Sequence, residues 1–231
     1  KYKPKNIKEI LGNENIVLEI NSWLKNYKTA EYSSILITGS HGIGKELIIK
    51  ILLKENNYYF DWLQYKDQKN NEFMYNISNN HTRNKNRDIY IKDNKKYALI
   101  LDDISKISLK REKKEILNLL KSNKTKKKFP IILISNLNHN KLISDISKFA
   151  NKYSLNKPTY SNLKILYNKI IKSEKINISS TKVIKKIITN SDQDFRKIIL
   201  NLYDIKNTFG NKEIKDSDYK KYLISSENKS K

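Results

Sequence analysis

The sequence predicts an α/β fold, in which a parallel sheet with helices on both faces is followed by a small helical domain. Three short apolar runs, residues 33–39, 97–103 and 129–136, each end in a glycine, acidic or amide residue. Segments with helical periodicity alternate with these runs, as they do in parallel sheets. After Pro158 the remaining segments are predicted to be helical, with no strand between them.

The first predicted elements are a helix, a strand and a second helix. Residues 13–27, "NENIVLEINSWLKNY", place apolar side chains at helical spacing. Residues 33–39, "SSILITG", are β-branched and aliphatic and end in glycine, and residues 44–55, "GKELIIKILLKE", are predicted to form the following helix. Strand, glycine-rich turn and helix therefore follow one another directly.

The middle of the chain adds two more strands. Residues 64–96 are polar and rich in Asn, which predicts a loop with one short strand. Residues 97–103, "YALILDD", are apolar and then acidic, as expected of a strand buried on both faces. An amphipathic helix over 109–122 and a strand over 129–136, "FPIILISN", follow.

Three further helices are predicted near the carboxyl end, at 159–174, 179–191 and 192–207. The predicted organisation is therefore a nucleotide-binding α/β domain over 1–157, a helical domain over 158–225 and a disordered tail over 226–231. Ligands of parallel sheets bind beyond the carboxyl ends of the strands. We expect the site where Gly39, Asp102 and Asn136 end their strands.

The charge of the chain favours an anionic polymer as partner. The 47 Lys and Arg residues outnumber the 24 Asp and Glu residues and give a formal net charge of +23. Lys, Asn, Ile and Tyr are over-used together, so codon bias of an AT-rich genome is an alternative source of part of this charge. With no cysteine and only three histidines, a metal site made by side chains alone is not expected. No apolar run approaches the ~18 residues of a membrane span.

The strongest local motif is a phosphate-binding loop. Gly39, four further residues and then Gly44-Lys45 stand between the predicted strand and helix. Backbone N–H groups of such a turn hold phosphates, and Lys45 is expected to reach the β and γ oxygens of ATP. The predicted loop consists of Gly39, Ser40, His41, Gly42, Ile43, Gly44 and Lys45.

Asp102 and Asp103 end the second buried strand. At such sites the first carboxylate holds Mg²⁺ through water, and the second orients the attacking water. An aspartate in the second place has an arm shorter than a glutamate by about 1.5 Å. A strand-end turn pair is the alternative interpretation of the two residues.

Glu46 occupies the place where phosphate-binding loops carry Ser or Thr. A carboxylate ~4 Å from a phosphate oxygen is repelled by about 4 kcal/mol at an effective dielectric near 20. In an empty site, the favourable interaction of the same carboxylate with the helix N-terminus contributes only about 0.3–1 kcal/mol. We therefore expect weak ATP affinity and slow or absent turnover, unless Glu46 is a direct Mg²⁺ ligand or turns away.

Four segments in order resemble the AAA+ clamp loaders. In residues 1–26 the matching positions Tyr2, Pro4, Ile10 and Leu11 would lie against adenine. Residues 75–85 resemble the family's Asn-Ala-Ser-Asp-x-Arg segment, and residues 130–142 its sensor-1 strand. Residues 191–202 resemble the sensor-2 helix of the lid. The resemblance implies a AAA+ P-loop NTPase sheet with a three-helix lid, and assigns catalytic roles to Asp103, Asn136 and Arg196, the last two facing the phosphates.

Within the family, residues 21–26 and 135–142 are most similar to the large subunit of replication factor C. Small subunits carry a Ser-Arg-Cys motif, whereas the corresponding residues 144–155 contain no Arg. The resemblance therefore favours an end position in a hetero-oligomer over a homo-oligomer. The collar domain of the family is not found in this sequence.

The resemblance implies an ATP-binding subunit of a sliding-clamp loader acting in DNA replication, in the nucleus or at a viral replication site. Its partners would be the clamp, the other loader subunits and primer-template DNA. Phosphate contacts without sequence readout are expected from Arg83, Lys85, Lys106, Lys110 and Arg111. The lysine cluster in 121–130 is interpreted as a solvated connection. The alternatives are a catalytically silent nucleotide-binding scaffold, and an origin-recognition AAA+ protein, which predicts a winged helix after residue 225 that the sequence lacks.

Overall fold

The structure is a computed structural model that describes residues 1–65, 96–136 and 140–229. The chain divides into two compact units. One is Pro4–Asn156, and the other combines Lys1–Lys3 with the chain from Lys157 onward. Within the described residues, no helix has both the length and the apolar character that a bilayer span requires.

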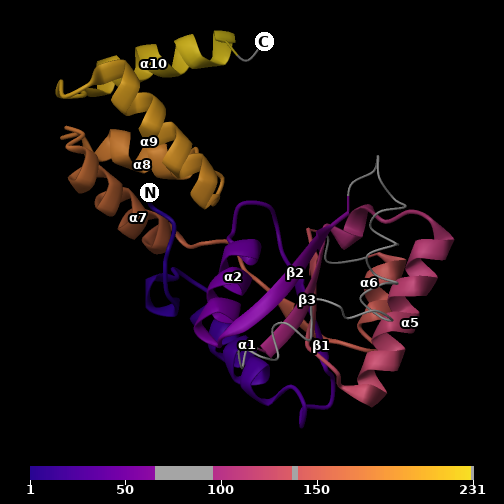
Figure 1. Ribbon diagram of the computed structural model, residues 1–231. Helices are drawn as coiled ribbons and strands as arrows, with labels where there is room; N and C mark the ends of the chain where they lie inside the picture. The colour runs from indigo at the N-terminus through magenta and orange to yellow at the C-terminus, as the bar shows by residue number, and fades with distance from the viewer. Residues whose placement is uncertain (66–95, 137–139, 230–231) are drawn as a thin grey trace. The chain divides into compact units, whose positions relative to one another are not determined.

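The first unit is built on a five-stranded sheet in the order β2-β3-β4-β1-β5, and every strand pair is parallel. This confirms the predicted α/β class. Figure 1 shows α1 and α2 on one face of the sheet and α5 and α6 on the other. The strands are β1 Ser34–Thr38, β2 Tyr58–Gln64, β3 Lys96–Asp102, β4 Ile131–Ser135 and β5 Asn151–Ser154.

Alternate residues of the central strands supply two separate hydrophobic cores, because successive side chains point to opposite faces. Ile35 and Ile37 of β1 pack with α1 (Glu14–Asn26) and α2 (Lys45–Glu55). Leu36 packs instead in the core that includes residues of α5 (Lys110–Lys126) and α6 (Lys141–Ile146). Both faces of β1 are therefore buried, as its continuous apolar run predicts.

The strand register brings the carboxyl ends together at one edge of the sheet. Thr38 pairs with Ser135 and Ser154, and Gln64 pairs with Asp102. The residues that follow these strands, including the loop after β1 and the acidic residues at the end of β3, are consequently neighbours in space.

Several elements differ from the sequence-based expectation. β2, β5 and α6 were not predicted, because β2 is mostly half-buried, and β5 and α6 are only four and six residues long. The short strand expected within 64–96 falls almost wholly outside the described residues. Among its described residues, the first unit also contains two 3-10 turns, η1 (Ile7–Glu9) and η2 (Ile104–Lys106).

The second unit contains four helices among its described residues, α7 Tyr160–Glu174, α8 Thr181–Thr189, α9 Phe195–Phe209 and α10 Asp216–Lys229. α10 is one helix more than the sequence predicts, and it continues to Lys229, into the residues expected to form a disordered tail. Its Tyr219 is buried and stacks on Tyr222, which also packs against Phe209 of α9. Aromatic packing accounts for this helix better than its weak apolar periodicity does.

Candidate nucleotide-binding site

The loop between β1 and α2 depends on glycine at two positions that shape it. Gly39 has φ +147°, and a Cβ there would lie 2.5 Å from Ile43 Cδ1 and 2.9 Å from the Leu155 carbonyl oxygen. Gly44, with φ 98°, is the N-cap of α2, and no side chain caps the helix there. The loop therefore leads directly into the N–H groups of a helix start, which is the chemistry that phosphate binding requires.

Lys45 lies across this loop. Its ammonium donates hydrogen bonds to the carbonyl oxygens of Gly39 and Ser40 and to Asn136 Oδ1, each at 2.8 Å. The residue is 5% exposed. A buried positive charge is thus held at the mouth of the loop by short, charge-assisted bonds.

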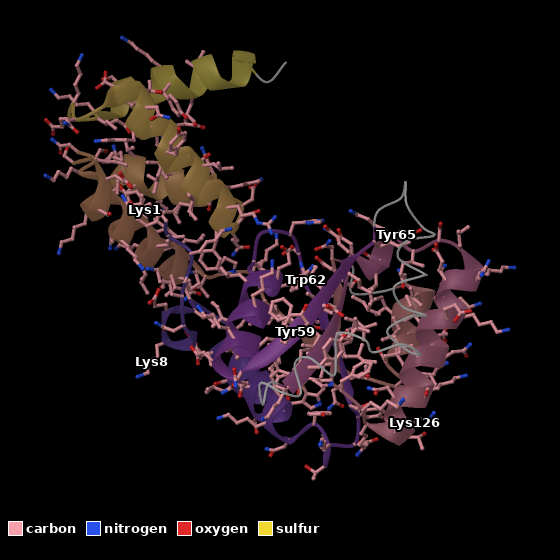
Figure 2. The ribbon with its side chains drawn as sticks, viewed as in Figure 1. Lys1, Lys8, Tyr59, Trp62, Tyr65 and Lys126 are labelled. Carbon is pink, nitrogen blue, oxygen red and sulfur yellow. The ribbon has the colours of Figure 1, made fainter. Side chains whose placement is uncertain are left out.

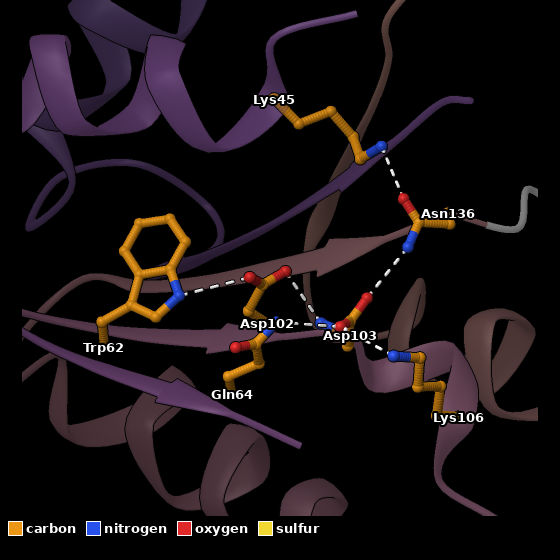
Figure 3. A network of polar contacts seen from close by, with 7 residues as sticks. All are labelled: Lys45, Trp62, Gln64, Asp102, Asp103, Lys106 and Asn136. Atoms are coloured by element: carbon orange, nitrogen blue, oxygen red, sulfur yellow. Dashed lines mark hydrogen bonds and ion pairs between the residues drawn. The ribbon is translucent and has the colours of Figure 1, made fainter. Parts of the chain in front are cut away.

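Asn136 joins the loop to the acidic end of β3. While its Oδ1 accepts from Lys45, its Nδ2 donates to Asp103 Oδ1 at 2.9 Å (Figure 3). The predicted residues Lys45, Asn136 and Asp103 therefore form one continuous hydrogen-bonded chain. Both ends of the amide are occupied, which fixes its orientation.

Asp103 is an ionised acceptor in this arrangement. Its backbone is left-handed, with φ 58°, a conformation that Asp tolerates better than most residues. Gln64 Nε2 and Lys106 Nζ each donate to its Oδ2 at 3.1 Å. Burial alone would raise the pKa of the Asp103 carboxyl, but the bonds from Lys106 and Gln64 outweigh burial and lower it.

Asp102 has the opposite environment. It is 4% exposed, accepts the Asp103 backbone N–H at 2.8 Å through Oδ1, and accepts Trp62 Nε1 at 3.2 Å through Oδ2. Burial raises its pKa, and the negative charges of Glu46 and Asp103 raise it further. A cation beside Asp102 would relieve this repulsion.

Glu46 belongs to the same electrostatic neighbourhood. It is half-buried in the first turn of α2, and its charge acts on the pKa of Asp102. No group of three or more His, Cys, Asp or Glu side chains among the described residues could hold a metal. Mg²⁺ is commonly bound by one or two carboxylates together with substrate phosphates and water, and Asp102 and Glu46 fit that arrangement.

The remaining predicted nucleotide contacts are distributed over both units. Ile10 is buried in the core beside α1, and Pro4 and Leu11 are half-buried. Tyr2 belongs to the second unit, where its hydroxyl donates to Glu174. Arg196 also belongs to the second unit and lies exposed in the first turn of α9. The adenine and sensor-2 roles of these residues stay predictions.

The predicted DNA contacts are only partly described. Arg83 and Lys85 lie outside the described residues. Lys110 and Arg111 are exposed at the start of α5. Lys106 is exposed and forms an ion pair with Asp103, so it is tied to the carboxylate end of β3.

Trp62 and Gln64 are two site residues that the sequence analysis missed. They lie two residues apart on β2 and therefore on one face of the strand, and each donates to one of the two carboxylates. The only sequence signal was the aromatic run "YYFDWLQ". Its role at the site becomes apparent only from its parallel pairing with β3, which brings it beside the two carboxylates.

The described residues have the fold of the AAA+ P-loop proteins. Two structures of RuvB from Thermotoga maritima share the fold. One, of a variant with a single substitution, has a TM-score of 0.69 and 17% identity, and the one described as the Holliday junction branch migration motor has 0.68 and 18%. Each match covers 97% of this chain and 72% of RuvB.

The sequence itself is similar to clamp-loader large subunits. It is 25% identical over 267 residues to the putative replication factor C large subunit of Acanthamoeba polyphaga mimivirus, covering 96% of this chain and 50% of that protein. For the replication factor C large subunit of Methanococcus aeolicus the identity is 23%, and the match covers 97% of this chain and 47% of that protein. For replication factor C subunit 1 of Drosophila melanogaster the identity is 22%, and the match covers 86% of this chain and 23% of that protein.

These similarities confirm the resemblance to the AAA+ clamp loaders and show that it is divergent. No protein-family model matches the chain. The chain spans about half the length of the first two of these relatives.

Proposed function

We propose that the chain is the ATP-binding part of a sliding-clamp loader large subunit, acting in DNA replication in a nucleus or at a viral replication site. The observation that carries this proposal is the chain of bonds from Lys45 through Asn136 to Asp103 beside the glycine loop. The similarity to replication factor C large subunits over 96–97% of the sequence supports the biological setting. The proposed partners are the clamp, primer-template DNA and other loader subunits.

Each residue has a defined task in this proposal. ATP with Mg²⁺ supplies a phosphoanhydride whose cleavage releases the clamp and DNA. The loop N–H groups and Lys45 would hold the phosphates, while Asp102 would hold the metal ion through water. Asp103, ionised because its pKa is lowered, orients the attacking water, and Asn136 positions Lys45 and Asp103 relative to each other.

A catalytically silent, nucleotide-binding scaffold is the second candidate. Glu46 brings a negative charge to the phosphate loop, and Asp103 already accepts from Asn136, Gln64 and Lys106. Both features oppose rapid hydrolysis. Single-turnover hydrolysis, with and without clamp, DNA and partner subunits, separates the two candidates. Cleavage favours the loader ATPase, whereas retained ATP binding without cleavage under every condition favours the scaffold.

The proposed DNA interface gives a prediction on salt dependence. Replacing Lys110 and Arg111 with Ala should weaken binding of primer-template DNA. The plot of log association constant against log salt concentration should also become less steep, by about 0.9 for each phosphate that is no longer neutralised. Both side chains are exposed in the first turn of α5. The measurement is a series of binding titrations at increasing salt.

A matched control removes two lysines elsewhere. Lys25 is exposed in the last turn of α1, and Lys126 is exposed at the far end of α5 (Figure 2). The Lys25→Ala/Lys126→Ala variant should keep the slope of the unmodified protein. Equal slopes for all three proteins would remove Lys110 and Arg111 from the interface.

A further inference from the structure

Trp62 has an unusual position for a large aromatic side chain on β2. It is half-buried, and its indole N–H points at Asp102, donating to Oδ2 at 3.2 Å (Figure 3). The ring is held on two sides. Lys50 Nζ of α2 lies 4.5 Å from the ring centroid, and Phe60 packs against it edge-on at 6.3 Å. The indole is therefore a fixed donor rather than a mobile one.

The geometry points to Trp62 as the positioning residue for the metal-binding carboxylate, Asp102. This inference rests on the proposed function, since it assumes that Asp102 serves Mg²⁺ beside a bound nucleotide. Groups that hydrogen-bond to metal-binding carboxylates fix their orientation, and losing one typically weakens metal affinity 10–100-fold.

The hydrogen bonds of Asp102 support this role. Among the described residues, the Asp103 backbone N–H donates to Oδ1 and the indole N–H donates to Oδ2. Together the two donors set the plane of the carboxylate and leave further lone pairs for a metal-bound water. Of the two, only the indole can be removed by a side-chain substitution.

The electrostatic setting points the same way. Asp102 is 4% exposed, and Glu46 and Asp103 place negative charge near it. A buried carboxylate needs hydrogen-bond donors or a cation to replace the water that it has lost. Trp62 supplies a neutral donor, which stabilises the carboxylate without competing with a metal ion for the site.

The position on β2 adds a structural reason. Trp62 and Gln64 share one face of the strand, and Gln64 donates to Asp103 while Trp62 donates to Asp102. One strand thus supplies one neutral donor to each of the two carboxylates. A structural tryptophan also needs a partner for its N–H, as Trp23 has in the Tyr32 carbonyl, so the Mg²⁺ dependence of nucleotide binding is what separates the two roles.

The test is Trp62→Phe, which keeps an aromatic ring and removes the N–H. Binding of a non-hydrolysable ATP analogue is measured in EDTA and across a MgCl₂ titration. We expect nucleotide affinity in EDTA to be unchanged, while the Mg²⁺ concentration needed for half of the Mg²⁺-dependent gain in affinity rises about 10-fold or more. A loss that is equal with and without Mg²⁺ would overturn the positioning role.

Trp23→Phe is the matched control. Trp23 also donates its indole N–H, to the Tyr32 carbonyl at 2.9 Å, but it lies in α1. This variant should lower thermal stability and leave the Mg²⁺ titration unchanged. An equal Mg²⁺ shift in both variants would mean that Trp62→Phe acts through general destabilisation, and the inference would fall.

A second measurement does not depend on the stability of Trp62→Phe. The sequence has two tryptophans, so Trp23→Phe leaves Trp62 as the single tryptophan reporter. Adding Mg²⁺ to the nucleotide complex should change its emission, and Asp102→Asn should abolish that change. Emission that ignores Mg²⁺ while Mg²⁺ still strengthens nucleotide binding would contradict the inference. Absence of nucleotide binding by the unmodified protein would instead defeat the proposed function.

Discussion

Replacing Glu46 with Thr is expected to strengthen binding of Mg²⁺–ATP about 10–100-fold and to increase single-turnover hydrolysis. The carboxylate is half-buried in the first turn of α2, and its charge already acts on Asp102. Repulsion between unit charges ~4 Å apart is about 4 kcal/mol at an effective dielectric near 20. Partial solvent screening reduces this figure, and each 1.4 kcal/mol corresponds to about tenfold in affinity. A threonine hydroxyl also offers Mg²⁺ a neutral ligand.

Glu14→Thr is the control for this substitution. Glu14 is exposed in the first turn of α1, so its replacement removes the same charge from the first turn of a different helix. Nucleotide affinity should then stay at the level of the unmodified protein. If Glu46→Thr instead weakens Mg²⁺–ATP binding, Glu46 is a direct metal ligand, and the expectation of repulsion is wrong.

Replacing Gly39 with Ala is expected to abolish measurable nucleotide binding and to destabilise the α/β unit by about 2–6 kcal/mol. Holding a residue with a Cβ in a sparsely populated backbone region destabilises the folded state by about 1–3 kcal/mol. Crowding adds about 1–3 kcal/mol. The crowding is specific, since the new Cβ would meet Ile43 Cδ1 at 2.5 Å and the Leu155 carbonyl oxygen at 2.9 Å. Urea unfolding and nucleotide titration measure the two effects.

Gly210→Ala separates backbone strain from crowding. Gly210 has φ +60° at the end of α9, and no atom lies within 4 Å of a Cβ built there. It should cost about 1–3 kcal/mol from backbone strain alone and leave nucleotide binding intact. Equal destabilisation by the two substitutions, or full nucleotide binding by Gly39→Ala, would show that the close approach at Gly39 is not required.

The elements that sequence reasoning predicted are those whose burial is uniform. β1 and β4 are buried at every position and β3 over its last five, so continuous apolar runs identified them. β2 mixes aromatic and polar residues because most of its side chains are half-buried. β5, "NKYS", is too short and polar to stand out, and it was missed although it pairs with β1 over four residues.

The candidate site also combines residues that local sequence patterns predict with residues that only the tertiary structure identifies. Lys45, Asp102, Asp103 and Asn136 were predicted because each stands at a strand end or in a motif of fixed spacing, and hydrogen bonds connect them. Their donors from β2, Trp62 and Gln64, depend on the register between β2 and β3. Register is a tertiary property, and no local pattern around residues 58–64 encodes it.

Every role proposed for this chain depends on binding of nucleotide phosphates by the loop from Gly39 to Lys45. The most direct measurement is a calorimetric titration of the unmodified protein and of Lys45→Ala with a non-hydrolysable ATP analogue and Mg²⁺. We predict saturable one-to-one binding to the unmodified protein and affinity at least about tenfold weaker for Lys45→Ala, because a charge-assisted bond contributes about 1.5–3 kcal/mol. Equal affinity of the two proteins, or no binding to either, would contradict the account.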